Sequence, residues 1–200
     1  THHPWPAVLE QALVAGVDCV QVREKDMTAR ALERRVSEVM RLVGEHQGDR
    51  ARAVIVNDRA DIAAACGADG VHLGQGDMSA AGARRAFGRS LIVGLSTSCL
   101  DEAKQAKADG ADYCGVGPMF ATTTKHKDHI VGPAYAKAFA EWAGLPGLAI
   151  GGITAGNAGE VAATGVTGIA VSSAVCSAAE PGAAARSLVA AMQKSDSDDA

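Results

Sequence analysis

The phrase KADGADYCGV at residues 107–116 runs from the end of a helix-like stretch, through a glycine, into a short apolar run. The same sequence pattern recurs in LVAGVDCVQV at 13–22, ACGADGVHL at 65–73 and AATGVTGIAV at 162–171. Glycine adopts at little cost the left-handed conformation that ends many helices. Each phrase therefore predicts a helix that ends near the glycine and a strand that follows it.

The four phrases are regularly spaced, since their glycines, at positions 16, 67, 110 and 165, are separated by 51, 43 and 55 residues. Between the phrases lie three more apolar runs, ARAVIVN at 51–57, SLIVGLS at 90–96 and GLAIGG at 147–152. Regular alternation of helix and strand indicates a parallel sheet. We predict seven strands, at residues 18–23, 53–57, 70–73, 91–95, 113–117, 148–151 and 168–172.

Two local signals support the intervening helices. A long helix between the first two strands is predicted by Thr28 as N-cap and by an apolar stripe at Leu32, Val36, Val39, Met40 and Val43. Ser98 and Asp101 have the spacing of a capping pair at the start of a later helix.

Seven strands with flanking helices suit either an open doubly wound sheet or an eight-stranded barrel. A doubly wound dinucleotide fold should carry G-x-G-x-x-G after its first strand, whereas this chain has VQVREKD at 20–26. We therefore predict an α/β fold, a (β/α)8 TIM barrel whose first β-strand is missing from the given chain, because THHPWP at 1–6 is too short and polar to form it. Residues 1–194 are expected to form a single catalytic domain, and 195–200 a solvated tail.

The composition excludes several classes of protein. A chain of 200 residues that is 48% hydrophobic can bury a sizeable core. Its net charge of −4 and lack of a basic block argue against nucleic-acid binding and favour a small ligand held by a few placed groups. No apolar run approaches the roughly 20 residues of a membrane span. Five scattered cysteines without a C-x-x-C pair fit a reducing compartment, so we expect a cytoplasmic protein.

Catalytic residues of a barrel lie at the C-terminal ends of its strands, and charged residues follow the first expected strand. Arg23 offers a planar fork and Lys25 a point charge, a combination suited to phosphate oxygens. Charged residues are also common at solvated strand ends, where these two cations would pair with Glu24.

Asp58 and Asp77 follow consecutive strands, which lie about 4.8 Å apart in a parallel sheet, so both carboxylates can reach one cation. Mg²⁺ is typically bound by one or two carboxylates, waters and substrate phosphates. Together with the nearby cations, the two aspartates indicate a magnesium-diphosphate site. The alternative is that Asn57 and Asp58 form a turn or cap the helix expected from Ala60 onward.

Other candidate site residues are polar or glycine-rich. His72 has no second histidine at a metal spacing in these strands, so a core or substrate-contact role is favoured over zinc. Glycine-rich or small turns follow the last two strands, at AIGGI (149–153) and AVSSAV (170–175), where barrels commonly bind phosphate. Tight turns without a ligand are the alternative. ATTTKHKD at 121–128 supplies hydroxyls and a lysine, or forms a flexible polar loop.

Seven segments in order together resemble the thiamine phosphate synthase family. They are QVREK at 21–25, VNDR at 56–59, GVHLGQGD at 70–77, GLST at 94–97, VGPMFATTTK at 116–125, AIGGI at 149–153 and AVSSA at 170–174. The resemblance extends over nearly the whole chain. It implies a barrel enzyme that joins a hydroxymethylpyrimidine diphosphate to a thiazole phosphate and releases diphosphate, with Mg²⁺ as cofactor.

The resemblance also implies roles for individual residues. Contacts to the pyrimidine diphosphate would come from Gln21, Val22, Arg23, Glu24, Lys25, Asn57, His72 and Ser96, and the Mg²⁺ ligands would be Asp58 and Asp77. The thiazole phosphate would be bound by Thr122, Thr123, Thr124, Gly152, Ser172 and Ser173, with Lys125 on the diphosphate side. Of these, Arg23, Lys25, Lys125 and Ser96 would be catalytic.

A dissociative reaction needs no side-chain nucleophile, which agrees with the absence of a Ser-His-Asp or Cys-His pattern. Two positions depart from the family: Thr123 stands where relatives usually have proline, and Ser172 where they usually have an aliphatic residue. The alternatives are a thiazole tautomerase of the same superfamily and a non-catalytic phosphate-binding protein. The sequence leaves open whether the chain forms a homo-oligomer.

Overall fold

The computed structural model describes residues 3–46, 51–122, 129–142 and 144–193. Helices and strands alternate along the chain. The strands are β1 (Cys19–Val22), β2 (Ala53–Asn57), β3 (Gly70–Leu73), β4 (Ile92–Thr97), β5 (Tyr113–Val116), β6 (Gly147–Ile150) and β7 (Gly168–Ala170). The helices are α1 (Trp5–Val14), α2 (Ala29–Glu45), α3 (Ala60–Cys66), α4 (Ala80–Phe87), α5 (Leu100–Ala108), α6 (Gly132–Trp142), α7 (Ala158–Ala162), α8 (Ser173–Cys176) and α9 (Pro181–Gln193).

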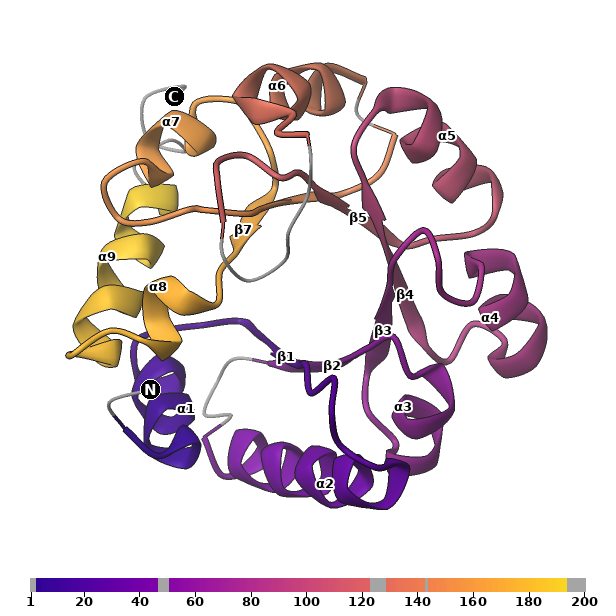
Figure 1. Cartoon of the computed structure of the whole chain (residues 1–200), viewed down its shortest axis with the longest axis vertical. Helices are drawn as coiled ribbons and strands as arrows, with labels where there is room; N and C mark the ends of the chain where they lie inside the picture. Colours follow the sequence, from indigo (N-terminus) through magenta and orange to yellow (C-terminus); the bar gives the residue numbers. More distant parts are fainter. Residues whose placement is uncertain (1–2, 47–50, 123–128, 143, 194–200) are drawn as a thin grey trace.

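All seven predicted strands are confirmed, and they form one parallel sheet in the order β1-β2-β3-β4-β5-β6-β7. The sheet curves around a centre and the helices surround it on the outside, as in a TIM-like α/β fold (Figure 1). Within the described residues β1 and β7 are the two edges, so a closed eight-stranded barrel is not seen. Trp5 and Pro6 begin helix α1, as expected of a segment that does not form a strand.

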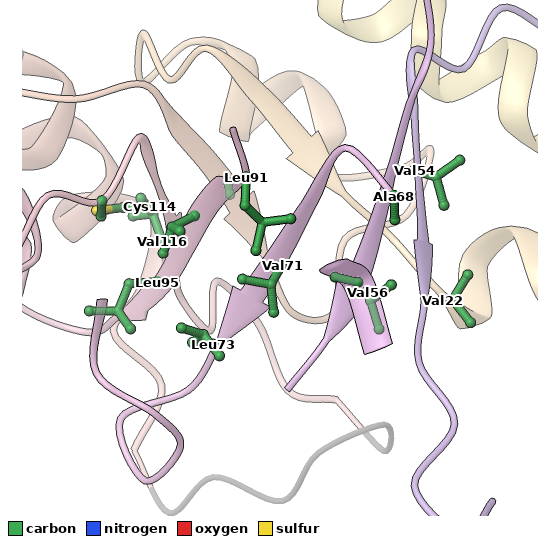
Figure 2. Close-up of a cluster of buried hydrophobic side chains, with 14 of the residues drawn as sticks. Val22, Val54, Val56, Ala68, Val71, Leu73, Leu91, Leu95, Cys114 and Val116 are labelled. Atoms are coloured by element: carbon green, nitrogen blue, oxygen red, sulfur yellow. The ribbon is translucent and has the colours of Figure 1, made fainter. Parts of the chain in front are cut away.

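The core lies between the outer face of the sheet and the helices. Alternate residues of neighbouring strands, such as Val22, Val56, Val71 and Val116, form one buried cluster (Figure 2). The apolar stripe of α2 packs against this cluster, with Val36 fully buried. Each such side chain contributes about 1.5–3 kcal/mol when it is removed from water, so this layer holds the strand ends in place.

The inner face of the sheet pairs small residues with large ones. A methyl group at Gly94 would overlap the ring of Tyr113, and one at Gly115 would lie 2.9 Å from Cε1 of His72. These two glycines therefore leave the space in which the rings of His72 and Tyr113 lie, above neighbouring strands.

The predicted helix ends are confirmed at the glycines, which have φ angles of 97° (Gly16), 69° (Gly67), 87° (Gly110) and 81° (Gly165). Thr28 caps α2, because its hydroxyl accepts a hydrogen bond from the amide of Ala31. The pair predicted at Ser98 and Asp101 is wrong by one residue. The carboxylate of Glu102 instead accepts hydrogen bonds from the amide and the hydroxyl of Ser98, at 2.6 and 2.9 Å.

None of the helices in the described part of the chain combines the length and the apolar character needed to cross a membrane. The predicted tail at 195–200 lies outside the described residues.

Candidate functional site

The polar strand ends meet at one edge of the sheet, because all seven strands are parallel. The register pairs Val22 with Val56 and Asn57 with His72, so the segments that follow β1, β2 and β3 leave the sheet side by side. The sequence predicted this convergence. Of the residues expected in the first segment, Gln21 and Arg23 are exposed, whereas the side chain of Val22 is buried in the core.

An ion pair joins the first two strand ends. The ammonium of Lys25 lies 3.0 Å from Oδ2 of Asp58, and their side chains are 50% and 26% exposed. Glu24 turns away and binds Arg35 of α2 at 2.7 Å. The alternative that Arg23 and Lys25 form a solvated strand end paired with Glu24 is therefore wrong for Lys25, and no ion pair joins Arg23 to an acidic residue that the structure describes.

Asp58 has a special backbone conformation. Its φ angle is 63°, the only positive value of a non-glycine residue in the described part of the chain. Its amide donates a hydrogen bond to the carbonyl of His72 at 2.9 Å, which fixes the turn against β3. The cap position of α3 is Arg59, so Asp58 does not cap that helix. A left-handed residue that is not glycine stores strain, and such strain is concentrated at functional sites.

Asp77 is held by its own loop. Its carboxylate accepts a hydrogen bond from the amide of Gly74 at 2.7 Å, and its amide donates to the carbonyl of Gly74 at 3.2 Å. Asp77 also lines a cavity of about 360 Å³, together with Gln75 and Leu95 and residues of α5. A larger cavity of about 460 Å³ lies between α1 and α9. Its lining includes Gly16 and Arg52, which come just before β1 and β2, so this cavity is at the other end of the strands from Asp58 and Asp77.

The described residues contain no cluster of three or more histidine, cysteine, aspartate or glutamate side chains that would form a closed metal site. Asp58 and Asp77, which follow neighbouring strands, are an oxygen-only pair. This donor set fits Mg²⁺, which needs few protein ligands and keeps positions for water and phosphate. It does not fit zinc, which prefers three or four nitrogen or sulfur ligands.

The inner face carries a chain of hydrogen bonds. His72, which is 6% exposed, has Nδ1 at 3.0 Å from the hydroxyl of Tyr113 and Nε2 at 2.9 Å from the hydroxyl of Ser96. The carbonyl of Ser96 accepts a hydrogen bond from the side chain of Gln75 at 2.7 Å. Both ring nitrogens of His72 are thus engaged by hydroxyls, which agrees with the predicted core or substrate-contact role.

The contacts of Tyr113 and Gln75 were not predicted from the sequence. Tyr113 begins the strand YCGV, and the alternation of strand residues places it on the same face as Gly115. The alternation of strand residues could therefore have predicted that Tyr113 faces the same side of the sheet as Gly115. The hydrogen bond from Gln75 to a backbone carbonyl has no sequence pattern of its own.

A second group of candidates gathers after β5 and β6. The amides of Met119 and Phe120 donate to the carbonyls of Ile150 and Gly151 at 2.9 and 3.0 Å, so the two segments run together beyond the sheet. Gly152 has a φ angle of 66°, and a side chain there would overlap the carbonyl of Ala121. Gly152 thereby comes next to the segment that contains Thr122.

Ser172 and Ser173 are exposed at the start of α8, directly beyond β7. Thr123, Thr124 and Lys125 lie outside the described residues. Asn157 fixes the loop after β6, because its side chain donates to the carbonyl of Gly152 at 3.0 Å and accepts from the amide of Thr154 at 2.8 Å.

Comparisons with known proteins show which proteins this chain resembles. A family model described as thiamine monophosphate synthase matches residues 2–175. The chain is 46% identical over 175 residues to the thiamine-phosphate synthase of Gloeobacter violaceus, covering 88% of this chain and 50% of that protein. It is 45% identical over 186 residues to that of Chlorobium luteolum, covering 92% of this chain and 86% of that protein.

Among solved structures, the thiamine phosphate pyrophosphorylase from Pyrococcus furiosus is similar with a TM-score of 0.87 and 34% identity. The similarity covers 96% of this chain and 91% of that one. The chain thus spans half of one long relative and most of two shorter ones.

Proposed function

This chain belongs to the thiamine monophosphate synthase family, and from that premise we propose that it is a transferase of thiamine biosynthesis. The reaction joins 4-amino-2-methyl-5-hydroxymethylpyrimidine diphosphate to 4-methyl-5-(2-phosphoethyl)thiazole. A bond forms between the thiazole nitrogen and the pyrimidine methylene carbon, and the bond from that carbon to the diphosphate oxygen breaks. The products are thiamine phosphate and diphosphate.

The observation that carries the proposal is the ion pair between Lys25 and Asp58 at 3.0 Å. It brings together a cation of the kind that binds phosphate and a carboxylate of the kind that binds Mg²⁺, at the ends of adjacent strands. Both side chains remain partly exposed, and pairs of this kind contribute only about 0–1 kcal/mol. If Asp58 held a metal ion, Lys25 could therefore exchange the carboxylate for a diphosphate oxygen at small cost in free energy.

Mg²⁺, held by Asp58 and Asp77, would supply positive charge that neutralises the departing diphosphate. The side chains do the remaining work on this leaving group. Arg23, exposed at the end of β1, would bind its terminal oxygens as a planar fork, with Lys25 and Lys125 as further cations for the diphosphate. Gln21 and Asn57, at the ends of β1 and β2, would orient the substrate between them, while Val22 and Glu24 would contribute through their backbones.

The electron-rich aminopyrimidine can carry positive charge on its methylene once diphosphate has left. Ser96 and His72, on the inner face, would hold this ring in place, so that it cannot turn away before the new bond forms. Positioning and exclusion of water then replace a side-chain nucleophile.

The thiazole phosphate would bind where the segments after β5, β6 and β7 meet. Because Gly152 has no side chain, its backbone can lie close to the carbonyl of Ala121. Polar backbone groups of these two segments would then be available to the phosphate. Hydroxyls of Thr122, Ser172 and Ser173, together with Thr123 and Thr124, which lie outside the described residues, would bind the phosphate there. Loops after the last strands of barrels commonly bind phosphate in this way.

The (β/α)8 barrel expected from the sequence remains part of the proposal. β1 and β7 each have an unpaired edge in the described residues, and an eighth parallel strand between them would satisfy both. We also propose that the protein acts in the cytoplasm as a single catalytic domain.

The test is direct synthesis. Purified protein is mixed with both phosphorylated substrates and Mg²⁺, and thiamine phosphate is followed by chromatography, with EDTA as the control. We expect product that depends on the metal. Isomerisation of a thiazole carboxylate without condensation would indicate a tautomerase instead, and tight phosphate binding without any reaction would indicate a regulator.

A further inference from the structure

Tyr113, His72 and Ser96 form a chain of three polar groups on the inner face of the sheet. They come from β5, β3 and β4, and the rings of Tyr113 and His72 lie with their centroids 5.5 Å apart. His72 bridges the two hydroxyls through its two ring nitrogens, at 3.0 Å and 2.9 Å. The proposed function uses Ser96 and His72 and assigns nothing to Tyr113.

The positions of the protons follow from hydrogen-bond accounting. A neutral imidazole has one N–H donor and one acceptor nitrogen. Burial raises the pKa of the Tyr113 hydroxyl far above its usual value, so this group keeps its proton at neutral pH. The Tyr113 side chain is partly buried, and Nδ1 of His72, 3.0 Å away, is the acceptor that the geometry supplies for its hydroxyl proton. Tyr113 therefore donates to Nδ1, which leaves the imidazole proton on Nε2.

This arrangement sets the direction of the next hydrogen bond. With its proton on Nε2, His72 donates to the hydroxyl oxygen of Ser96 at 2.9 Å. The hydroxyl proton of Ser96 is then free to point away from His72, toward a bound ring. In the opposite tautomer Ser96 would give its proton to His72 and could only accept from a ligand.

We propose that Tyr113 is a positioning residue that fixes the Nε2–H tautomer of His72 and thereby makes Ser96 a hydrogen-bond donor toward a ring nitrogen of the pyrimidine substrate. The inference rests on the proposed function for the identity of that substrate. It adds a rule for its orientation, because the ring nitrogens of an aminopyrimidine accept hydrogen bonds and its amino group donates them. The ring must present an unprotonated nitrogen to Ser96.

Two glycines of the neighbouring strands leave space for the rings of Tyr113 and His72. Gly94 leaves the room that the Tyr113 ring occupies, and Gly115 leaves the room beside the His72 ring. A larger residue at either position would push the ring away. The two glycines therefore preserve the distances between Tyr113, His72 and Ser96.

The test uses Tyr113→Phe, which removes the hydroxyl and keeps the ring that fills the space above Gly94. Tyr135→Phe is the matched control, because the hydroxyl of Tyr135 is also inside the protein but has the Thr97 hydroxyl and the carbonyl of Cys99 as its hydrogen-bond partners. The first readout is the ¹⁵N spectrum of the His72 ring in the protein without substrates, which needs no activity.

We expect the wild type and Tyr135→Phe to carry the His72 proton on Nε2, and Tyr113→Phe to show a mixture of tautomers. In kinetics, Tyr113→Phe should lower kcat/KM for the pyrimidine diphosphate about tenfold and leave KM for the thiazole phosphate unchanged. An analogue with C–H in place of the ring nitrogen should be rejected strongly by the wild type and only weakly by Tyr113→Phe.

A wild-type protein with the proton on Nδ1, or a tautomer that Tyr113→Phe does not change, would overturn the inference even in an active enzyme. If the wild type and Tyr113→Phe reject the analogue equally, the claim that Ser96 donates to a ring nitrogen of the substrate is overturned. If the wild type has the expected tautomer but forms no thiamine phosphate, the proposed function fails instead, and the orientation rule fails with it.

Discussion

The Lys25 ammonium and the Asp58 carboxylate lie 3.0 Å apart and connect the ends of β1 and β2. The two residues are far apart in the sequence, and each alone has an ordinary explanation as a polar strand end. Their contact brings opposite charges together at the edge of the sheet where parallel-sheet enzymes bind substrates. Replacement of Asp58 therefore probes both the proposed metal site and the local backbone.

Asp58→Asn should reduce kcat/KM by at least about tenfold at a fixed Mg²⁺ concentration, because an amide is a much weaker ligand for Mg²⁺ than a carboxylate. The melting temperature should change little, since an exposed ion pair contributes about 0–1 kcal/mol. Asp61→Asn is the matched control, because Asp61 forms a similar exposed pair with Arg59 at 2.6 Å. Calorimetric titration of Mg²⁺ in the presence of diphosphate measures the effect, and equal losses in the two variants would contradict the metal role.

The backbone of Asp58 allows a separate prediction about stability. Because its φ angle is 63°, a side chain with Cβ but no short polar group is disfavoured there, at a cost of about 1–2 kcal/mol. Asp58→Ala should therefore unfold at lower urea concentration than Asp58→Asn or Asp58→Gly. An identical free energy of unfolding for the three variants would show that the left-handed conformation is not maintained in solution.

The strand positions could be predicted because each depended on a local pattern. The glycines at 16, 67, 110 and 165 and the apolar runs required no knowledge of distant contacts, and all seven strands are found. The capping pair was misplaced by one residue because a longer side chain, Glu102, reaches Ser98 from the next position. Closure of the barrel could not be judged locally, since it depends on the pairing of the two edge strands.

The candidate site was predicted as a set of strand ends, but its internal contacts were not. The partner of Glu24 is Arg35, because α2 passes beside the end of β1, and sequence proximity had suggested Arg23 or Lys25. The contact between Tyr113 and His72 joins residues 41 positions apart. It requires the sheet register and the space above Gly94, neither of which a single sequence pattern displays.

Gly94→Ala tests whether that space is needed. The new methyl group would overlap the Tyr113 ring, which must move and lose its hydrogen bond to His72. We expect lower stability, by about 1–3 kcal/mol as in other overpacked cores, and a fall in kcat/KM for the pyrimidine diphosphate. Gly159→Ala, in α7, is the control, because its methyl group meets no atom within 4 Å and should stabilise the helix. Unchanged chemical shifts of Tyr113 in Gly94→Ala would contradict the packing argument.

The pH dependence of stability should reveal the buried thiol of Cys114. Burial raises the pKa of this thiol from 9.0 to about 11 in the folded protein. Because the folded pKa lies above the unfolded one, the stabilisation is fully present below pH 9.0 and is lost as the pH rises toward about 11. A tenfold change in the acid dissociation constant corresponds to about 1.4 kcal/mol, so urea unfolding curves should show a loss of up to about 3 kcal/mol across this window.

Cys114→Ala removes the titrating group, so its free energy of unfolding should fall less steeply between pH 9 and 11 than that of the wild type. The variant should be less stable at pH 7, because truncation of a fully buried side chain leaves a cavity. The difference between the two proteins should therefore shrink as the pH rises. A constant difference across the pH range would show that Cys114 does not titrate differently in the folded and unfolded states.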